Sequence, residues 1–339
     1  MAKNGCFQCF IRTCILIFFT SNSIGFTFGG DVIVATANNP PFIGISNITI
    51  DDTTINLTPI PAMVTKPYGI VYDGIDSMVY WEDVALDTIE KYSVEDKTHD
   101  YFITDVDSNE ARNGIEIDVI NRKLYWVDDG GTSIYVINLD GTERKKFFND
   151  SEIIRFDNLR IDSKNRYLYW VGTDINKYVK IERVCLDDIS IRENITDARR
   201  SVTGGLSISK TGKLYWYDGG PTTIWECDLD GTNARQVTNS AYTLNTQVYG
   251  NYVYYNSAIY DGIGRADIET GQKMELYESE LHTIFIYSED RCNVDCLNGG
   301  VCVTSVNNTQ SCQCPIGFVG PTCKRITGYC NCVKHQTQN

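Results

Sequence analysis

Six cysteines near the C-terminal end of the chain are the residues whose types and spacing point most clearly to chemistry. They follow the pattern Cys-x3-Cys-x5-Cys-x9-Cys-x-Cys-x8-Cys and are Cys292, Cys296, Cys302, Cys312, Cys314 and Cys323. Thiols at such short intervals form disulfides in an oxidising compartment or bind a metal such as zinc in a reducing one. Six cysteines allow many pairings, so the spacing alone does not choose among them.

The other residues that could do chemistry are few or lack partners. The chain has three histidines, His99, His282 and His335, and no Gly-x-Ser-x-Gly segment that would mark an activated nucleophile. Asp and Glu total 44 residues, but abundance does not identify a catalytic pair of carboxylates. We therefore predict a protein without catalytic activity and without a bound cofactor.

The first residues and the net charge indicate an exported protein. Lys3 and Arg12 precede an apolar run at 14–19, and small and polar residues follow as far as Gly25. This order is typical of a secretory signal peptide over residues 1–25, and the run is shorter than the roughly 20 residues that span a membrane. We expect a secreted, extracellular protein with no membrane span in the mature chain. The formal charge of -14 argues against nucleic-acid binding, which needs clustered Lys and Arg.

Five sequons for N-glycosylation agree with export. Each has Ser or Thr two positions after an asparagine, and the asparagines are Asn47, Asn56, Asn149, Asn194 and Asn307. A single sequon arises easily by chance, whereas five of them behind a signal peptide predict a glycosylated surface.

Aromatic pairs that follow an apolar residue divide the chain into repeats. Their tyrosines lie 45, 44, 46 and 39 positions apart and are Tyr80, Tyr125, Tyr169, Tyr215 and Tyr254. A period of about 40–45 residues is that of a four-stranded propeller blade. Each repeat has an apolar first strand, the aromatic strand, a third strand and a short charged fourth strand, with turns such as Asp140-Gly141 that supply positive φ angles. We interpret the aromatic side chains as core that packs between neighbouring blades.

These repeats resemble the low-density lipoprotein receptor class B repeat, also called the YWTD repeat. The two residues after the aromatic pair vary here, but Asp83, Asp128 and Asp218 keep the final Asp. The resemblance implies an all-β fold in which a six-bladed propeller occupies residues 31–290. It also implies that the two ends share one blade, so that a strand at 283–288 closes the ring by pairing with the N-terminal blade.

The clustered cysteines, together with Gly299-Gly300 and the segment Gly317 to Gly320, resemble an EGF-like domain over residues 291–325, followed by a polar tail at 326–339. This second resemblance implies pairing of Cys292 with Cys302, of Cys296 with Cys312, and of Cys314 with Cys323. Calcium-binding members carry an aromatic residue after an Asp or Asn between the third and fourth cysteines, and none follows Asn307. We expect a module that binds no calcium, and secretion makes a zinc site the weaker alternative.

Four cysteines lie outside this pattern. Cys185 and Cys227 fall on the third strands of adjacent repeats, offset by one position, so a bridge between them stays open. Cys330 and Cys332 could pair with each other, extend the module or bridge to another chain.

Loops after the aromatic strands are rich in Asp and Gly and would ring one end of the propeller channel. The resemblance implies that protein partners bind at this end, although turn propensity alone also explains Asp and Gly there. The candidate ligand-binding residues are Asp83, Asp128, Asp129, Asp174, Asp218, Tyr260 and Asp261. We expect a propeller–EGF unit that binds an extracellular protein partner, a matrix or signalling ligand with a basic surface. Two other functions stay open: a soluble carrier of a pigment or lipid-like molecule, and a calcium-dependent propeller hydrolase.

Overall fold

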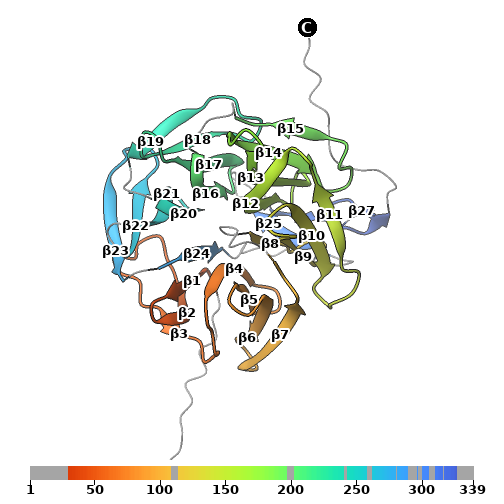
Figure 1. Ribbon diagram of the computed structural model, residues 1–339, viewed down its shortest axis with the longest axis horizontal. Coiled ribbons are helices and arrows are strands. Elements are labelled where there is room, and N and C mark those ends of the chain that lie inside the picture. Colours follow the sequence, from red (N-terminus) through yellow and green to blue (C-terminus); the bar gives the residue numbers. More distant parts are fainter. Residues whose placement is uncertain are drawn as a thin grey trace, which may run out of the picture.

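The computed structural model describes residues 30–107, 114–196, 202–239, 243–257, 262–279, 281–288, 296, 300–304, 310–315 and 317–326. Six four-stranded antiparallel sheets are arranged as blades around a central axis (Figure 1). The predicted all-β fold, a six-bladed propeller with a small disulfide-rich module, is confirmed. The predicted signal peptide and the polar tail after Ile326 lie outside the described residues.

We name the blades A to F in chain order and give their strands from the innermost to the outermost. Blade A contains β24 (Thr283–Tyr287), β1 (Val32–Asn38), β2 (Pro41–Asn47) and β3 (Thr58–Pro59). Blade B contains β4 (Pro67–Asp73), β5 (Met78–Asp83), β6 (Thr88–Ser93) and β7 (Thr98–Thr104). Blade C contains β8 (Ile115–Asp118), β9 (Lys123–Asp128), β10 (Ser133–Asn138) and β11 (Lys145–Asn149).

The other three blades have the same order. Blade D contains β12 (Ile153–Asp162), β13 (Tyr167–Asp174), β14 (Val179–Cys185) and β15 (Arg192–Asn194). Blade E contains β16 (Val202–Ile208), β17 (Lys213–Asp218), β18 (Thr223–Asp228) and β19 (Arg235–Asn239). Blade F contains β20 (Thr243–Tyr249), β21 (Tyr252–Ser257), β22 (Gly262–Asp267) and β23 (Lys273–Glu278).

Blade A joins the two ends of the propeller. Its innermost strand β24 pairs antiparallel with β1, placing Phe285 opposite Val34. Beside this pair, the carboxylate of Asp31 accepts hydrogen bonds from the Ser288 hydroxyl at 3.0 Å and from the Tyr249 hydroxyl at 2.6 Å. One acidic side chain therefore ties the closing strand to the neighbouring blade F.

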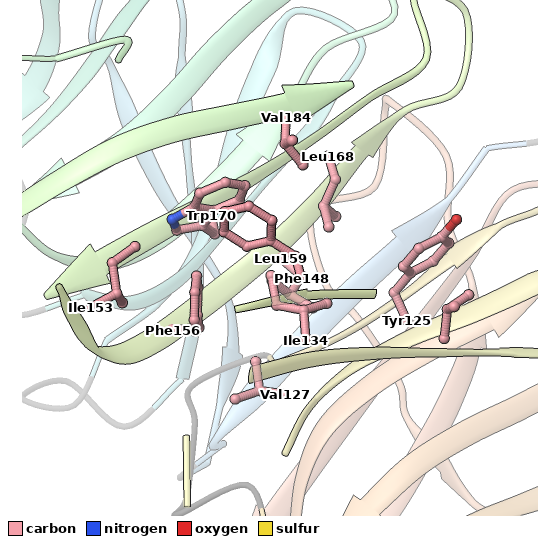
Figure 2. Close-up of a cluster of buried hydrophobic side chains, with 11 residues drawn as sticks. Tyr125, Val127, Ile134, Phe148, Ile153, Phe156, Leu159, Leu168, Trp170 and Val184 are labelled. Carbon is pink, nitrogen blue, oxygen red and sulfur yellow. The ribbon is translucent and has the colours of Figure 1, made fainter. Parts of the chain in front are cut away.

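The aromatic side chains of the repeats pack between blades. Between blades C and D, the Trp170 ring lies 5.1 Å from the Phe148 ring and 5.6 Å from the Phe156 ring, measured between centroids (Figure 2). Trp81, Trp126 and Trp170 are fully buried. Large rings of this kind each bury on the order of 150–250 Å², so the interfaces between blades form the core of the fold.

Turns between the third and fourth strands are shaped by Asp-Gly pairs. In blade C, the Asp140 carboxylate accepts hydrogen bonds from the backbone N–H of Thr142 at 2.9 Å and from its hydroxyl, and Gly141 has a φ of 86°. Gly231 takes the same place in blade E, where a Cβ would collide with the carbonyl oxygen of Ile195. These glycines supply the left-handed conformation that the turn requires.

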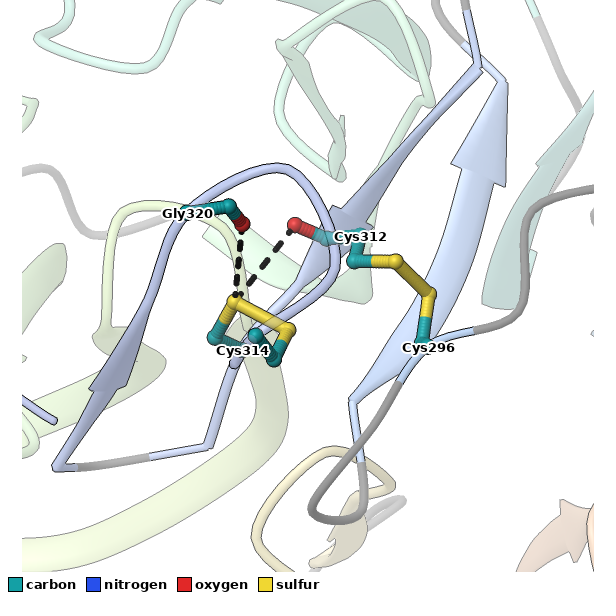
Figure 3. The surroundings of a disulfide bond; sticks show 5 residues. Cys296, Cys312, Cys314 and Gly320 are labelled. Carbon is teal, nitrogen blue, oxygen red and sulfur yellow. Dashed lines mark hydrogen bonds between the residues drawn. A yellow bond between two sulfur atoms is a disulfide. The ribbon is translucent and has the colours of Figure 1, made fainter. Parts of the chain in front are cut away.

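The C-terminal module is built from short hairpins and disulfides. Its strands are β25 (Val301–Thr304), β26 (Gln310–Gln313), β27 (Phe318–Val319) and β28 (Arg325–Ile326). Cys296 is bonded to Cys312 and Cys314 to Cys323, with Cα–Cα distances of 5.6 and 5.1 Å (Figure 3). These are two of the three pairs that the EGF resemblance implies. Cys302 is disulfide-bonded as well, and Cys292 lies outside the described residues.

The structure also resolves the open question about the two blade cysteines. Cys185 is disulfide-bonded, whereas Cys227 is a free, fully buried thiol, so the two do not bridge. Both belong to one apolar cluster between blades D and E, where burial raises the pKa of the Cys227 thiol to about 12. Cys330 and Cys332 lie outside the described residues.

Four of the five sequon asparagines have exposed side chains: Asn47, Asn56, Asn149 and Asn194. Exposure is what glycan attachment requires, and Asn307 lies outside the described residues. Within the described part of the chain, no helix has the length and apolarity needed to cross a membrane.

Candidate protein-binding face

Two sets of loops define one end of the propeller, which we call the rim face. One set joins the second strand of each blade to the third, and the other leads into each innermost strand. The chain leaves the propeller at the opposite end, where the Lys210 ammonium donates a 3.2 Å hydrogen bond to the carbonyl of Ser288. The rim face is therefore separated from the point at which the chain continues into the EGF-like module.

The Asp83 carboxylate joins two loops at the rim of blade B. Its fully buried carboxylate accepts hydrogen bonds from the backbone N–H groups of Thr65 at 2.6 Å, Lys66 at 3.0 Å and Ala85 at 3.2 Å. Two of these donors lie in the loop that enters the blade and one lies in the loop after β5. This one carboxylate therefore connects both loops.

Asp128 does the same in blade C. It is buried and accepts hydrogen bonds from the backbone N–H of Asp107 at 2.8 Å, the N–H of Asp129 at 2.9 Å and the Trp126 indole at 2.9 Å.

Asp218 is buried in blade E, where it accepts a 3.1 Å bond from the Gly220 N–H. In three blades, the carboxylate of the final Asp of the repeat thus accepts hydrogen bonds from loops of its own blade. Direct ligand contact by Asp83, Asp128 or Asp218 stays a prediction.

Blade D departs from this arrangement because Gly172 stands where blades B, C and E have Asp. Its second strand continues to Asp174, whose half-buried carboxylate accepts bonds from the N–H groups of Asn176 at 2.8 Å and Tyr178 at 2.9 Å. Asp174 therefore shapes the tip of a longer hairpin. The two remaining candidates, Tyr260 and Asp261, lie outside the described residues.

Among the candidates that the structure describes, Asp129 has the most exposed carboxylate, with 41% of its side chain accessible. The Lys146 ammonium lies 2.6 Å away, and its hydrogen bond holds the pKa of Asp129 below the usual value. Asp105 and Asp107 are exposed on the neighbouring loop that leads into blade C. The rim of blade C therefore presents three carboxylates to solvent, one of them paired with a lysine.

The rim of blade B carries apolar side chains, which the sequence analysis did not single out. Met63 is 87% exposed and Leu86 is 43% exposed, and Val64 and Val84 beside them are half-buried. The signal is present in the sequence as two apolar stretches at loop positions, 61–64 and 84–86. It lies outside the aromatic repeat, and scattered exposed apolar residues are common enough to be overlooked.

The inner strands add one buried ion pair near the axis. The Arg160 guanidinium on β12 donates a 3.4 Å hydrogen bond to the Glu116 carboxylate on β8, and both side chains are buried from solvent. Burial raises the pKa of Glu116 to about 7. This pair links blades C and D, and the described residues contain no group of three or more His, Cys, Asp or Glu that could hold a metal ion.

The two histidines that the structure describes pack against other side chains of the propeller. His99 lies with its Nε2 atom 2.5 Å from the buried carboxylate of Glu90, and its ring stacks on Trp81 at 5.3 Å. His282 packs edge-on against Tyr68 with 3.8 Å between ring centroids. His335 lies outside the described residues. Both described rings therefore pack on aromatic side chains of the blades.

Comparison with known proteins agrees with this architecture. A family model described as EGF-like domain matches residues 290–322. A chain from a nidogen/laminin complex superimposes with a TM-score of 0.66 at 19% identity, covering 76% of this chain and 98% of that one. The chain is a YWTD-type propeller followed by an EGF-like domain.

Relatives found by sequence are matched over only part of their own length. Protein cueball of Drosophila simulans is 22% identical over 304 residues, which cover 77% of this chain and 46% of cueball. The vitellogenin receptor of Solenopsis invicta is 22% identical over 203 residues, covering 58% of this chain and 11% of the receptor. The propeller–EGF chain thus spans about half the length of the cueball proteins it matches.

The propeller fold also occurs in an enzyme. A gluconolactonase of Xanthomonas campestris superimposes with a TM-score of 0.54 at 15% identity, covering 66% of this chain and 79% of the enzyme. At this identity the similarity concerns the fold, and function has to be argued from side chains.

Proposed function

We propose that this chain is a secreted, non-catalytic protein that binds an extracellular protein partner through the rim face of its propeller. The observation that carries the proposal is the rim itself. Buried carboxylates make its loops rigid, and these loops expose apolar side chains on blade B and carboxylates on blade C. Rigid loops on a β scaffold that present apolar and charged groups side by side are typical of protein-recognition surfaces.

The comparisons support the same proposal. The nidogen/laminin complex contains a chain of this fold together with a protein partner. Cueball is similar over 77% of this chain, and the vitellogenin receptor over 58%. The EGF-like domain and the sequons accord with an extracellular location.

Engineered glycans offer a direct test, because a glycan on the rim face would block a partner while one on the opposite end would not. Leu86→Asn creates a sequon with Thr88 on the rim of blade B. Ile75→Asn creates one with Ser77, in the loop between β4 and β5 at the opposite end, where Ile75 is 51% exposed against 43% for Leu86. Both substitutions replace an exposed aliphatic residue, so they are closely matched.

The secreted chain and its two glycan variants would be used to capture proteins from extracellular fluid, with mass spectrometry of the eluates. We expect a partner that the wild-type chain and Ile75→Asn both capture and Leu86→Asn does not. Equal capture by both variants would contradict a rim-face site. Release of acid from lactone or ester substrates by the purified chain would contradict the non-catalytic assignment.

A further inference from the structure

At the rim of blade B, apolar side chains lie on two loops that Asp83 joins, and we call them the blade B apolar surface. It consists of Pro61, Met63 and Val64 from the loop that enters the blade, and Val84, Ala85 and Leu86 from the loop after β5. Met63 is the most exposed large apolar side chain of the described residues, at 87%. Single exposed apolar residues are ordinary, but four exposed and two half-buried ones on two adjoining loops are a feature of docking sites.

The two loops are held in one arrangement, so these side chains have a defined position. The Asp83 carboxylate bonds to N–H groups of both loops, and the Val84 N–H donates a 3.1 Å bond to the Lys66 carbonyl. Beneath them, Val64 packs against the buried cluster between blades A and B. The apolar surface is therefore already formed before any partner binds, which lowers the entropy cost of association.

The next blade supplies charge complementarity for one kind of occupant. Blades B and C share an apolar interface and are neighbours in the ring. The rim loops of blade C expose Asp105, Asp107 and Asp129, and the Lys146 ammonium already pairs with Asp129. The Arg144 guanidinium also reaches this rim, 3.4 Å from the Asp128 carboxylate. Four carboxylates, those of Asp105, Asp107, Asp128 and Asp129, therefore face two cations, and an occupant that continues from blade B onto blade C would meet an excess of negative charge among the described residues.

We infer that one extended segment of an extracellular protein binds across both blades, with aliphatic or aromatic side chains on the blade B apolar surface and Lys or Arg residues on the blade C carboxylates. The inference rests on the proposed function and gives its partner a chemical class. Anionic membranes are disfavoured as the occupant, because the exposed carboxylates beside the apolar surface repel them.

The probe for this inference is a displayed library of random linear peptides, panned against the secreted glycosylated chain. We expect the enriched peptides to combine apolar residues with Lys or Arg. A double variant, Met63→Asp with Leu86→Asp, should weaken their binding by about tenfold or more, since apolar anchors dominate such interfaces. The matched control is Ile75→Asp with Ile189→Asp, two exposed isoleucines in loops at the opposite end, which should leave affinity unchanged.

Several outcomes would overturn the inference. In the first two, the enriched peptides lack the apolar–basic pattern, or no peptide is enriched. In the third, the peptides bind the Met63/Leu86 variant as tightly as the wild-type chain. In the fourth, the wild-type chain floats with anionic vesicles and the Met63/Leu86 variant does not. Folding of each variant is checked by thermal unfolding, and Met63→Ser with Leu86→Ser serves as a milder second variant. If a captured partner is blocked by the glycan at position 86 but binds the Met63/Leu86 variant normally, this inference fails while the proposed function stands.

Discussion

Blades B and C are neighbours, and each builds its rim around the same buried carboxylate. Asp83 and Asp128 both accept backbone N–H bonds from the loop that enters the blade and from the loop after the second strand. The side chains that these loops expose are opposite in character, apolar in blade B and acidic in blade C. The repeated Asp therefore provides a common scaffold, and the variable loop residues around it decide what the rim can bind.

The difference between the two blades continues toward the axis. On the innermost strands, Val71 of blade B and Glu116 of blade C both lie opposite the tyrosine of the aromatic pair. Val71 is fully buried in an apolar cluster, whereas Glu116 is buried against Arg160 of blade D. Blade B is thus held by packing alone at this position, and blade C by packing with an ion pair.

The largest expected effect concerns what the two blades share. Asp83→Ala would leave three backbone N–H groups without their acceptor, and Asp128→Ala would leave a comparable set. Each substitution should lower the free energy of unfolding by about 2–4 kcal/mol, because unsatisfied buried donors keep their full desolvation cost. Urea unfolding monitored by tryptophan fluorescence measures the change.

Asp87→Asn is the control, because Asp87 is exposed on the same blade B loop and Asn also tolerates its φ of 54°; it should change stability by less than about 0.5 kcal/mol. If Asp83→Ala unfolded like the wild-type chain but lost its partner, Asp83 would be a ligand-binding residue and the common scaffold would be refuted.

The pH dependence of stability should distinguish blade C from blade B. Burial raises the pKa of Glu116 to about 7 in the folded chain, above its usual value near 4.5. Between these two values the folded state binds more protons than the unfolded state, so this residue makes stability fall as pH rises from about 4.5 to 7. Glu116→Gln should remove a pH-dependent loss of about 1–3 kcal/mol.

The measurement is urea unfolding of the wild-type chain and of Glu116→Gln at pH 5 and pH 7.5, and the quantity compared is the difference between the two proteins. Val71→Leu in blade B serves as a control, because it changes an apolar contact and should shift stability equally at both pH values. A Glu116→Gln difference that is the same at both pH values would show that the Arg160 pair keeps the carboxylate ionised throughout.

Much of the fold could be predicted from the sequence because the aromatic pairs repeat at blade intervals and their rings must be buried. The chemistry of the rim could not be predicted in the same way. Asp83 ends an aromatic strand and Asp129 follows one, and the sequence alone does not tell which of these two carboxylates is buried. Only the loop at 60–66, which belongs to no repeat and folds over Asp83, makes the first one a buried scaffold residue.

The same reason explains why the blade B apolar surface escaped the sequence analysis. Met63 lies in a connection between blades, where no periodic pattern distinguishes an exposed side chain from a buried one. Cys227 illustrates a related limit, since a free thiol and a disulfide-bonded one at equivalent strands differ only in the geometry of their neighbours.

A smaller effect is expected from neutralising the acidic rim. Asp105→Asn with Asp107→Asn should slow association of a rim-face partner about threefold to tenfold at low salt and make the rate less sensitive to salt, because steering depends on unscreened charge. Dissociation should change little. Stopped-flow or surface-based kinetics at two ionic strengths would show this, and the same substitution at exposed Asp76, on the opposite end, should have no effect. Equal salt dependence in both variants would mean that blade C takes no part in recognition.

The smallest effect concerns Asp129, whose pKa is lowered by its hydrogen bond with Lys146. A depressed carboxyl pKa contributes stability above its unfolded value and loses it as pH falls through the folded value. Because the pair is exposed, Asp129→Asn should move the melting temperature by less than about 1 °C. In a nuclear magnetic resonance titration, Lys146→Gln should return the pKa of Asp129 toward its usual value, and an unchanged pKa would refute the pairing. Since Lys146 already neutralises Asp129, replacing Lys146 should strengthen the binding of a partner's Lys or Arg residues.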